Sequence, residues 1–331
     1  MVATLNESRL ERHMNSKYAA KHIYSDALIQ KAKLPGSNIT LAYVVHESES
    51  PASALSTQDE VRVVLIMGYS YRKEEWAPTI DGLLTKWQES GNTAKLKLLS
   101  FDNRGCGHSD APWGRYSTKM LADDTLALMD HLGWQKAHII GTSMGGMISQ
   151  ELALKCPERV QSLSLVVTAR GKFCPDYSAL GPIIKSTTST DVEVITSNVV
   201  SFLYPAAFLD APIGDSGKTN RSVVHTYHKT GSAARGPPGT AGTLGQTSAL
   251  IFHFVDDNRL RQIRDHGYPI LIVGAQQDLA INVSHFVHLK ETLAASHTTS
   301  VNYEDAGHAV FLQHIDELAN DILGVICRVK K

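Results

Sequence analysis

Ser143 lies at the boundary between two stretches of different character in "HIIGTSMGGMISQELALKCPE". The residues before it have the apolar character of a buried strand, and those after it have the pattern of a helix. Gly141 and Gly145 stand two residues before and two residues after the serine. A serine hydroxyl needs a neighbouring base and a fixed, exposed position before it acts as a nucleophile, and a sharp strand-to-helix turn with small flanking residues provides that exposure. The spacing predicts a nucleophilic serine, against the alternative of a tight turn that serves helix packing alone.

Two backbone N–H groups are expected to stabilise the negative charge that an attack by this serine would develop. The helix after Ser143 points its N-terminus at the site, so the N–H of Met144 is predicted as the first donor. In "VVLIMGYS", Gly68 permits a turn after an apolar run, and the N–H of Tyr69 is predicted as the second donor. The ring of Tyr69 can also form part of a pocket wall.

An acid and a base are expected later in the chain, each beyond the carboxyl end of a strand. Asp278 is the first acid after "YPILIVGAQQ", and His308 lies in "SVNYEDAGHAVF". The histidine would take the serine proton and later return it to the leaving group, while Asp278 would orient the imidazole. The alternatives are a helix-capping role for Asp278 and a surface position for His308. Glu304 and Asp305 are rival acids, but their closeness in sequence to the histidine makes it harder for them to reach its far nitrogen.

Short apolar runs separated by helical segments must position these groups. The expected core strands are 61–67, 96–101, 137–140, 163–167 and 269–273, and residues 38–47 form an edge strand of an antiparallel hairpin. A helix is expected between them, with Ser117 or Thr118 as its cap and Gly133 as its stop. Apolar strands that alternate with helices predict an α/β fold with a mostly parallel, doubly wound sheet.

The interval between the strands at 163–167 and 269–273 is too long for a simple loop. We therefore expect a helical cap at 171–265, with a mobile Gly-rich segment at 231–245. The remaining boundaries are an N-terminal extension at 1–22, the first part of the core at 23–170 and its second part at 266–331.

Four motifs in order resemble those of the α/β-hydrolase fold superfamily. They are "GTSMGG" at the serine, "FDNRGCGHSD" after an inner strand, "GAQQD" before the acid and "DAGH" at the base, within a similarity from about Asn38 to Ile326. The resemblance implies a helical cap between core strands 6 and 7, and structural roles for Asp102, Arg104 and Gly107 in the loop beside the serine. One departure is Met67, where the superfamily commonly has histidine before the glycine, which puts the positioning of that loop in question more than activity.

The same resemblance narrows the reaction. Haloalkane dehalogenases and epoxide hydrolases of this fold use aspartate at the turn, so both are disfavoured, as are proline iminopeptidases, whose Gly-rich oxyanion segment is missing. Aromatic residues of the expected cap are candidates for the pocket, although at helical spacing they can equally form the core of the cap. The candidates are Phe202, Tyr204, Phe208 and Phe252.

An apolar pocket favours a capped serine hydrolase of esterase or lipase type, which cleaves a carboxylic ester through an acyl-enzyme. A carbon–carbon bond hydrolase or enol-lactonase, a perhydrolase and an acyltransferase would share the triad. A small-molecule receptor on the same fold is the alternative from another class.

Composition limits the partners and the compartment. The formal net charge is −1, which gives no sign of nucleic-acid binding, and a small-molecule ester is the expected partner. No apolar run reaches the ~20 residues of a membrane span, and four cysteines without metal-type spacing fit a cytoplasmic protein. Cys106 lacks a turn like that of Ser143 and is expected to fill space. No motif supports a metal, nucleotide or flavin cofactor, and the sequence does not indicate the oligomeric state.

Overall fold

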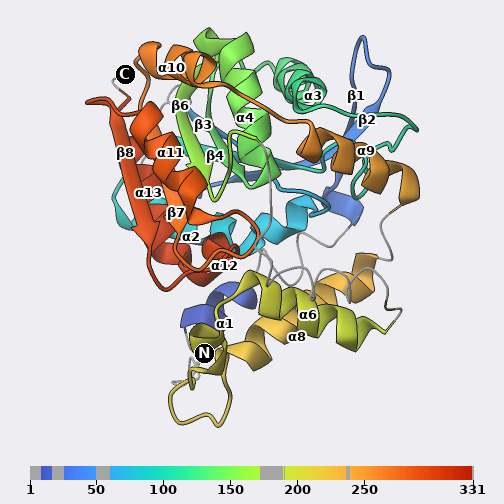
Figure 1. Ribbon diagram of the computed structural model, residues 1–331, viewed down its shortest axis with the longest axis vertical. Coiled ribbons are helices and arrows are strands. Elements are labelled where there is room, and N and C mark those ends of the chain that lie inside the picture. Colours follow the sequence, from blue (N-terminus) through green and yellow to red (C-terminus); the bar gives the residue numbers. More distant parts are fainter. Residues whose placement is uncertain are drawn as a thin grey trace.

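The computed structural model describes residues 9–16, 26–49, 60–171, 189, 191–235 and 239–329 (Figure 1). Within these residues the chain forms one eight-stranded sheet in the order β1-β2-β4-β3-β5-β6-β7-β8. Strands β1 and β2 and strands β2 and β4 pair antiparallel, and the other neighbours are parallel. The strands are β1 Gln30–Lys33, β2 Thr40–Glu47, β3 Glu60–Ile66, β4 Lys95–Phe101, β5 Ala137–Thr142, β6 Val160–Val166, β7 Ile270–Ala275 and β8 Thr298–Tyr303. The predicted α/β fold with a mostly parallel sheet is confirmed.

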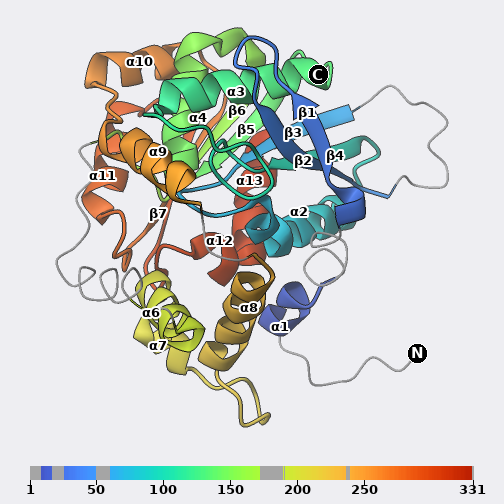
Figure 2. The same cartoon turned by 90° about the vertical axis from the view of Figure 1, so that its right-hand side faces the viewer.

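Helices cover both faces of this sheet (Figures 1 and 2). On one face, α2 and α13 pack together in a cluster with the inner side chains of β3, β4 and β7. On the other face, α3, α4, α10 and α11 close a second cluster. The helices are α1 Arg9–Met14, α2 Ala77–Glu89, α3 Thr118–His131, α4 Met144–Lys155, α6 Val192–Leu203, α7 Ala206–Asp210, α8 Asn220–Arg235, α9 Thr240–Ile251, α10 Asp257–Asp265, α11 Val283–Thr292, α12 Val310–Gln313 and α13 Ile315–Ile326, with 3₁₀ turns η2 Asp26–Leu28, η3 Lys73–Trp76 and η4 Pro157–Arg159.

Helix α3 shows how local sequence sets an element. The Ser117 hydroxyl accepts a hydrogen bond from the N–H of Met120 at 3.2 Å, which caps the first turn as predicted. Gly133 follows the helix at a φ of 68°, a conformation that glycine adopts without strain. The helix thus begins and ends where the sequence indicated.

The segment predicted as a cap contains helices in two different settings. Helices α6, α7 and α8 pack on one another away from the sheet, and α8 also contacts α1 (Figure 1). In contrast, α9 lies against the core loop that contains Gly105, and α10 packs on α4. Residues 172–188, 190 and 236–238 lie outside the described part of the chain.

The segment at 231–245 is helical in most of the parts that the structure describes, and its mobility stays a prediction. Residues 231–235 end α8, and residues 240–245 form the first half of α9. A side chain at Gly242 would collide with the backbone of Gly105, and one at Gly245 would collide with the ring of Tyr116. These glycines therefore allow a close approach between a helix and the core, which composition alone does not distinguish from flexibility.

Candidate active site

Ser143 stands alone between β5 and α4, with φ 55° and ψ −123°. This region is unfavourable for a residue with a side chain and persists only where the surroundings hold it. The N–H of Ser143 donates to the Val166 carbonyl at 2.9 Å, and its own carbonyl accepts from the Thr168 hydroxyl at 2.6 Å. Two hydrogen bonds to the end of the neighbouring strand and the loop after it therefore fix the turn.

Small residues around Ser143 allow the backbone segments to meet. A Cβ at Gly141 would collide with the Gly145 carbonyl, and a Cβ at Gly145 would collide with the carbonyl of Ile66 at the end of β3. Gly146, which the sequence analysis did not single out, would bring a Cβ within 2.6 Å of the Thr168 side chain. Helix α4 can start directly above the sheet because all three positions lack a side chain.

The structure brings Ser143, Asp278 and His308 together. His308 Nε2 lies 3.0 Å from Ser143 Oγ, and His308 Nδ1 lies 2.8 Å from Asp278 Oδ2. The other carboxylate oxygen of Asp278 accepts the N–H groups of Ala280 at 2.7 Å and Ile281 at 2.9 Å. With its proton on Nδ1, the imidazole donates to Asp278 and leaves Nε2 to accept the serine proton.

Burial of this triad is uneven. The side chain of Asp278 is 1% exposed and that of His308 is 11% exposed, so the acid is shielded while the base retains some access. The rival acid Asp305 has a side chain 74% exposed and lies 3.1 Å from His314 rather than beside His308. Glu304 is also exposed.

The predicted oxyanion loop passes directly beside the serine. A Cβ built on Gly68 would lie 3.0 Å from Ser143 Cβ and 3.5 Å from its Oγ, so this glycine leaves space next to the hydroxyl. Tyr69 is the next residue, and Met144 is the first residue of α4, whose N–H has no partner within the helix. Both predicted donors thus lie on segments that border Ser143, and their roles stay predictions.

Two side chains anchor the loop that contains Met67 and Gly68, in which the superfamily commonly has histidine at the position of Met67. Asn103 donates its amide to the Met67 carbonyl at 2.9 Å. Gln246 of α9, 1% exposed, accepts the N–H of Ser70 at 2.8 Å and donates to the carbonyl of Arg104 at 2.9 Å. The sequence analysis missed both residues, and Gln246 carried no recognisable signal because it belongs to a distant helix.

Asp102, Arg104 and Gly107 form the neighbouring loop. Asp102 is fully buried and accepts the backbone N–H and the ammonium of Lys73, each at 2.9 Å. Burial acts to raise the pKa of Asp102, but contacts from His108 and the charge of Lys73 outweigh it and lower the pKa. A Cβ at Gly107, whose φ is 56°, would collide with this carboxylate, so the loop wraps closely around it.

Arg104 closes the same loop from the other side. It makes a bidentate pair with Asp124 at 2.8 and 2.7 Å, a geometry that lysine cannot reproduce. Cys106 is buried in this loop and its thiol contacts the carbonyl of Tyr71, consistent with a packing role.

The four candidate pocket residues separate in the structure. Phe202 is half-buried and packs against a small apolar cluster of Met147, Ala169, Ala280 and Ile281, which adjoins the acid. Tyr204 is only 2% exposed, bonds His228 at 3.0 Å and stacks on Phe208 at 5.6 Å between ring centroids.

The last two candidates, Phe208 and Phe252, contact other parts of the molecule. Phe208 lines a separate cavity of about 340 Å³ between α1 and α13. Phe252 is 67% exposed with the Arg115 guanidinium 4.4 Å from its ring centroid, so it lines no enclosed pocket.

A larger cavity of about 920 Å³ lies elsewhere. Its lining includes Val160, where β6 begins, and Pro269 and His297, which precede β7 and β8. Asp278 and His308 follow the carboxyl ends of β7 and β8, the edge at which open α/β sheets hold their ligands. The larger cavity is therefore at the opposite edge of the sheet and is not part of this site.

Across the described ranges, no group of three or more histidine, cysteine or acidic side chains is arranged to hold a metal ion. Nor is any helix in the described part of the chain both long and apolar enough to cross a membrane.

Comparisons with known proteins agree with this architecture. A family model described as the alpha/beta hydrolase fold matches residues 61–191. A protein named as a carbamate hydrolase, RutD, from Azorhizobium caulinodans is 30% identical over 249 residues, which cover 74% of this chain and 80% of the relative. The 3-oxoadipate enol-lactonase 2 of Acinetobacter baylyi is 26% identical over 239 residues, 69% of this chain and 82% of the relative.

A solved structure extends the similarity to the whole fold. The crystal structure of the enol-lactonase from Burkholderia xenovorans superposes with a TM-score of 0.68 at 19% identity, covering 90% of this chain and all (100%) of the other. With the strand order, the strained serine and these relatives taken together, the chain belongs to the alpha/beta hydrolase fold family.

Proposed function

We propose that this protein hydrolyses a carboxylic ester through an acyl-enzyme on Ser143. The observation that carries the proposal is the hydrogen-bonded series from Ser143 Oγ through both nitrogens of His308 to the buried Asp278. A serine in this arrangement has its base in place and its exposure fixed by the turn. Asp278 is held as a carboxylate acceptor by two backbone N–H groups, so it can stabilise the imidazolium that forms.

The steps follow from the geometry. Ser143 Oγ attacks the carbonyl carbon while its proton passes to His308 Nε2, and the carbonyl oxygen becomes an oxyanion that the N–H groups of Met144 and Tyr69 would stabilise. The tetrahedral intermediate expels the alcohol, which takes the proton from His308. A water molecule then gives its proton to His308 and attacks the acyl carbon, and the acid leaves as Ser143 recovers its proton.

Apolar side chains beside the triad favour an apolar acyl group. Met147 lies on the helix that follows Ser143, Ile281 follows the acid, and Phe202 of α6 packs against the cluster that contains them. We propose that this cluster borders the acyl group of the substrate, because apolar side chains bind hydrocarbon better than charge. We propose that α6, α7 and α8 act as the cap over this site, and that the protein works in the cytoplasm on a small molecule rather than on nucleic acid.

The test is hydrolysis of p-nitrophenyl esters from acetate to palmitate by wild type and by Ser143→Ala, with labelling of both by a fluorophosphonate probe. We expect turnover and labelling in wild type and a loss of at least about 10⁴-fold in the variant. Labelling without turnover of any ester would refute the substrate and retain the nucleophile. Absence of both in folded wild type would refute the proposal.

A carbamate or an enol-lactone is the second candidate substrate, and the names of two relatives favour it. Both groups present a carbonyl that the same triad can attack, so carbamates and lactones belong in the assay beside the esters. A carbon–carbon bond hydrolase, a perhydrolase or an acyltransferase would also use Ser143, and identification of the products separates them. A receptor would instead show slow turnover with a large ligand-induced rise in Tm.

A further inference from the structure

The loop that carries His308 is held from two sides. It joins β8 to α12 and spans residues 304–309, with Ala306 and Ala309 fully buried. Its backbone bonds the acid loop, because the Gln277 N–H donates to the Ala306 carbonyl at 2.9 Å. The two hydrogen bonds of the imidazole hold the side chain of His308, and further contacts hold the backbone of its loop.

Gln313, the last residue of α12, forms two hydrogen bonds to the backbone of this loop through its side-chain amide. Its Oε1 accepts the N–H of Gly307 at 3.2 Å, and its Nε2 donates to the carbonyl of Asp305 at 2.7 Å. One bond is to Gly307, which immediately precedes the catalytic histidine, and the other is to Asp305 in the same turn. A single side chain thus closes the turn in which His308 stands, and its own helix is fixed by the N–H of Gln313 donating to the Ala309 carbonyl at 2.9 Å.

The last turn of α6 holds the other side. The Leu203 carbonyl accepts the N–H of Ala309 at 3.1 Å. A Cβ at Gly307 would collide with that same carbonyl and would lie 3.0 Å from Pro205 Cδ. Gly307 therefore serves a close approach between the histidine loop and the end of α6.

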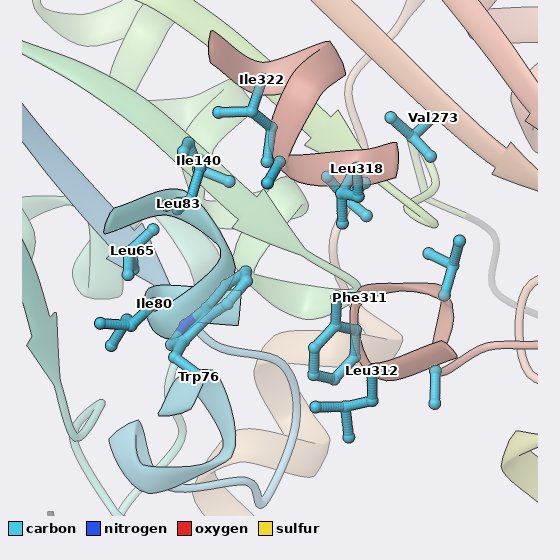
Figure 3. Close-up of a cluster of buried hydrophobic side chains, with 14 of the residues drawn as sticks. Leu65, Trp76, Ile80, Leu83, Ile140, Val273, Phe311, Leu312, Leu318 and Ile322 are labelled. Atoms are coloured by element: carbon cyan, nitrogen blue, oxygen red, sulfur yellow. The ribbon is translucent and has the colours of Figure 1, made fainter. Parts of the chain in front are cut away.

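This turn of α6 is itself rigidly placed. Leu203 and Tyr204 belong to the same buried cluster as Ala306, Ala309 and Phe311. Figure 3 shows Phe311 among the core side chains of this cluster. The Tyr204 hydroxyl bonds His228 of α8 at 3.0 Å, and burial raises the pKa of Tyr204. The contact with the histidine loop is thus part of a packed interface rather than a loose surface touch.

We propose that Gln313 is a positioning residue for His308 and that the hydrogen bond from Ala309 to the Leu203 carbonyl holds the same loop, so that α6 and the catalytic base move as one unit. This inference rests on the proposed function of the triad. The base must stay within hydrogen-bond reach of both the nucleophile and the acid, and a displacement of about 1 Å in such a constellation can cost about 100-fold in rate. A shift of α6 would displace Ala309 and Gly307, and with them the imidazole of His308.

The test replaces Gln313 and measures ester turnover and the rate of fluorophosphonate labelling. Gln313→Ala removes both bonds, and we expect kcat and the labelling rate to fall between about 10- and 100-fold with KM nearly unchanged. Gln313→Glu keeps the acceptor for Gly307 but loses the donor to Asp305, so it should recover part of the loss. The matched control is Gln277→Ala, whose side chain donates to the Glu304 carbonyl at 3.1 Å in the same loop but does not bond the residues next to His308.

A second readout needs no substrate. The proton that His308 Nδ1 shares with Asp278 is expected as a low-field NMR signal in wild type, identified by its loss in Asp278→Asn. Gln313→Ala should shift or broaden this signal, and Gly307→Ala should do the same by pushing the loop off Leu203. Wild-type kcat and an unchanged signal in folded Gln313→Ala would overturn the inference, as would an equal loss in Gln277→Ala. If wild type shows neither labelling nor turnover, the proposed function fails, while the signal still decides whether Gln313 positions the imidazole.

Discussion

A single residue, Ser143, concentrates the strain of the site. Its dihedral angles cost of the order of 1–3 kcal/mol, and the bonds to Val166 and Thr168 help to offset that cost. Three glycines around it remove collisions that any side chain would create. The G-x-S-x-G pattern was recognisable because the strained serine requires those small residues at fixed distances along the chain.

Gly68 permits a prediction at this scale. In Gly68→Ala the new methyl group would lie 3.0 Å from Ser143 Cβ and 3.5 Å from its Oγ. We propose that the substrate carbonyl enters this space. We expect kcat/KM to fall about 100-fold, comparable with the loss of one oxyanion donor, with a small change in Tm. Ester kinetics and thermal unfolding measure the two effects.

Gly324→Ala is the matched control for that substitution. Gly324 lies in α13 with no atom near the position of a Cβ, so alanine should stabilise the helix by about 0.5–1 kcal/mol and leave turnover unchanged. If Gly68→Ala keeps wild-type kcat/KM, the site does not use the space beside Gly68.

At the scale of elements, the sequence predicted the strands that form a continuous apolar run and the helix that carries its own capping residues. The apolar runs that became β5 and β7 are fully buried, and α3 carries its own cap and stop. Strand β8 was expected before His308 but was not among the apolar runs, because all six of its residues are half-buried and several are polar, which gives no clear period. Strand β8 forms by pairing with β7, a tertiary contact that the residue pattern of β8 does not indicate.

The aromatic residues of the predicted cap show a different limit. Spacing shows that one face of a helix is apolar, but it does not show which surface that face meets. Phe202 meets the cluster near the acid, Tyr204 meets His228, and Phe252 lies in solvent under Arg115. The partner of each face is decided by tertiary packing, so the pocket could not be read from the sequence while the triad could.

Helix α9 carries the prediction at this scale. Gln246→Leu would leave the N–H of Ser70 and the carbonyl of Arg104 without their partner. Each lost buried bond costs about 1–3 kcal/mol, so we expect the free energy of unfolding to fall by a few kcal/mol. We also expect kcat to fall, because the loop beside Ser143 loses an anchor. Denaturant unfolding and ester kinetics test both.

Thr243→Ala is the control on the same helix, because its hydroxyl bonds only the carbonyl of Gly239 at the helix start. It should change kcat little. If Gln246→Leu lowers stability while kcat equals that of the control, α9 supports the fold without positioning the oxyanion loop.

The whole molecule is tied together across the segments that the sequence separated. Helix α1 lies between α2 and α8 (Figure 2). Glu11 of α1 pairs with Lys218 at 2.9 Å, and His13 bonds both Asp81 at 2.9 Å and Asp316 at 3.1 Å. The segment predicted as an N-terminal extension thus contributes a helix that joins the core to the α6–α8 group. Trp76 and Phe311 lie side by side in one apolar cluster (Figure 3). The same cluster includes Val200 of α6 and Val224 of α8.

Three buried histidines give the whole molecule a dependence on pH. His46, His138 and His253 are each at most 7% exposed, and each bonds a serine or threonine hydroxyl. Burial lowers the pKa of His46 and of His138 to about 4 and that of His253 to about 3. The unfolded chain binds these protons near pH 6.5 and the folded chain does not, so the free energy of unfolding should fall as the pH drops from about 6.5 to 4.

Denaturant unfolding at several pH values between 7 and 4 measures that slope, to which each such histidine adds up to about 1.4 kcal/mol per pH unit. Carboxylates add their own acid sensitivity below about pH 5, so the decisive comparison is between variants. His138→Gln keeps a polar partner for Ser162 and removes one group that takes up a proton on unfolding. We therefore expect the slope of the unfolding free energy against pH between pH 6.5 and 5 to decrease by up to about 1.4 kcal/mol per pH unit. His131→Gln, at an exposed position near the end of α3, should leave it unchanged. Equal slopes in His138→Gln and wild type would mean that His138 is protonated in the folded protein despite its burial.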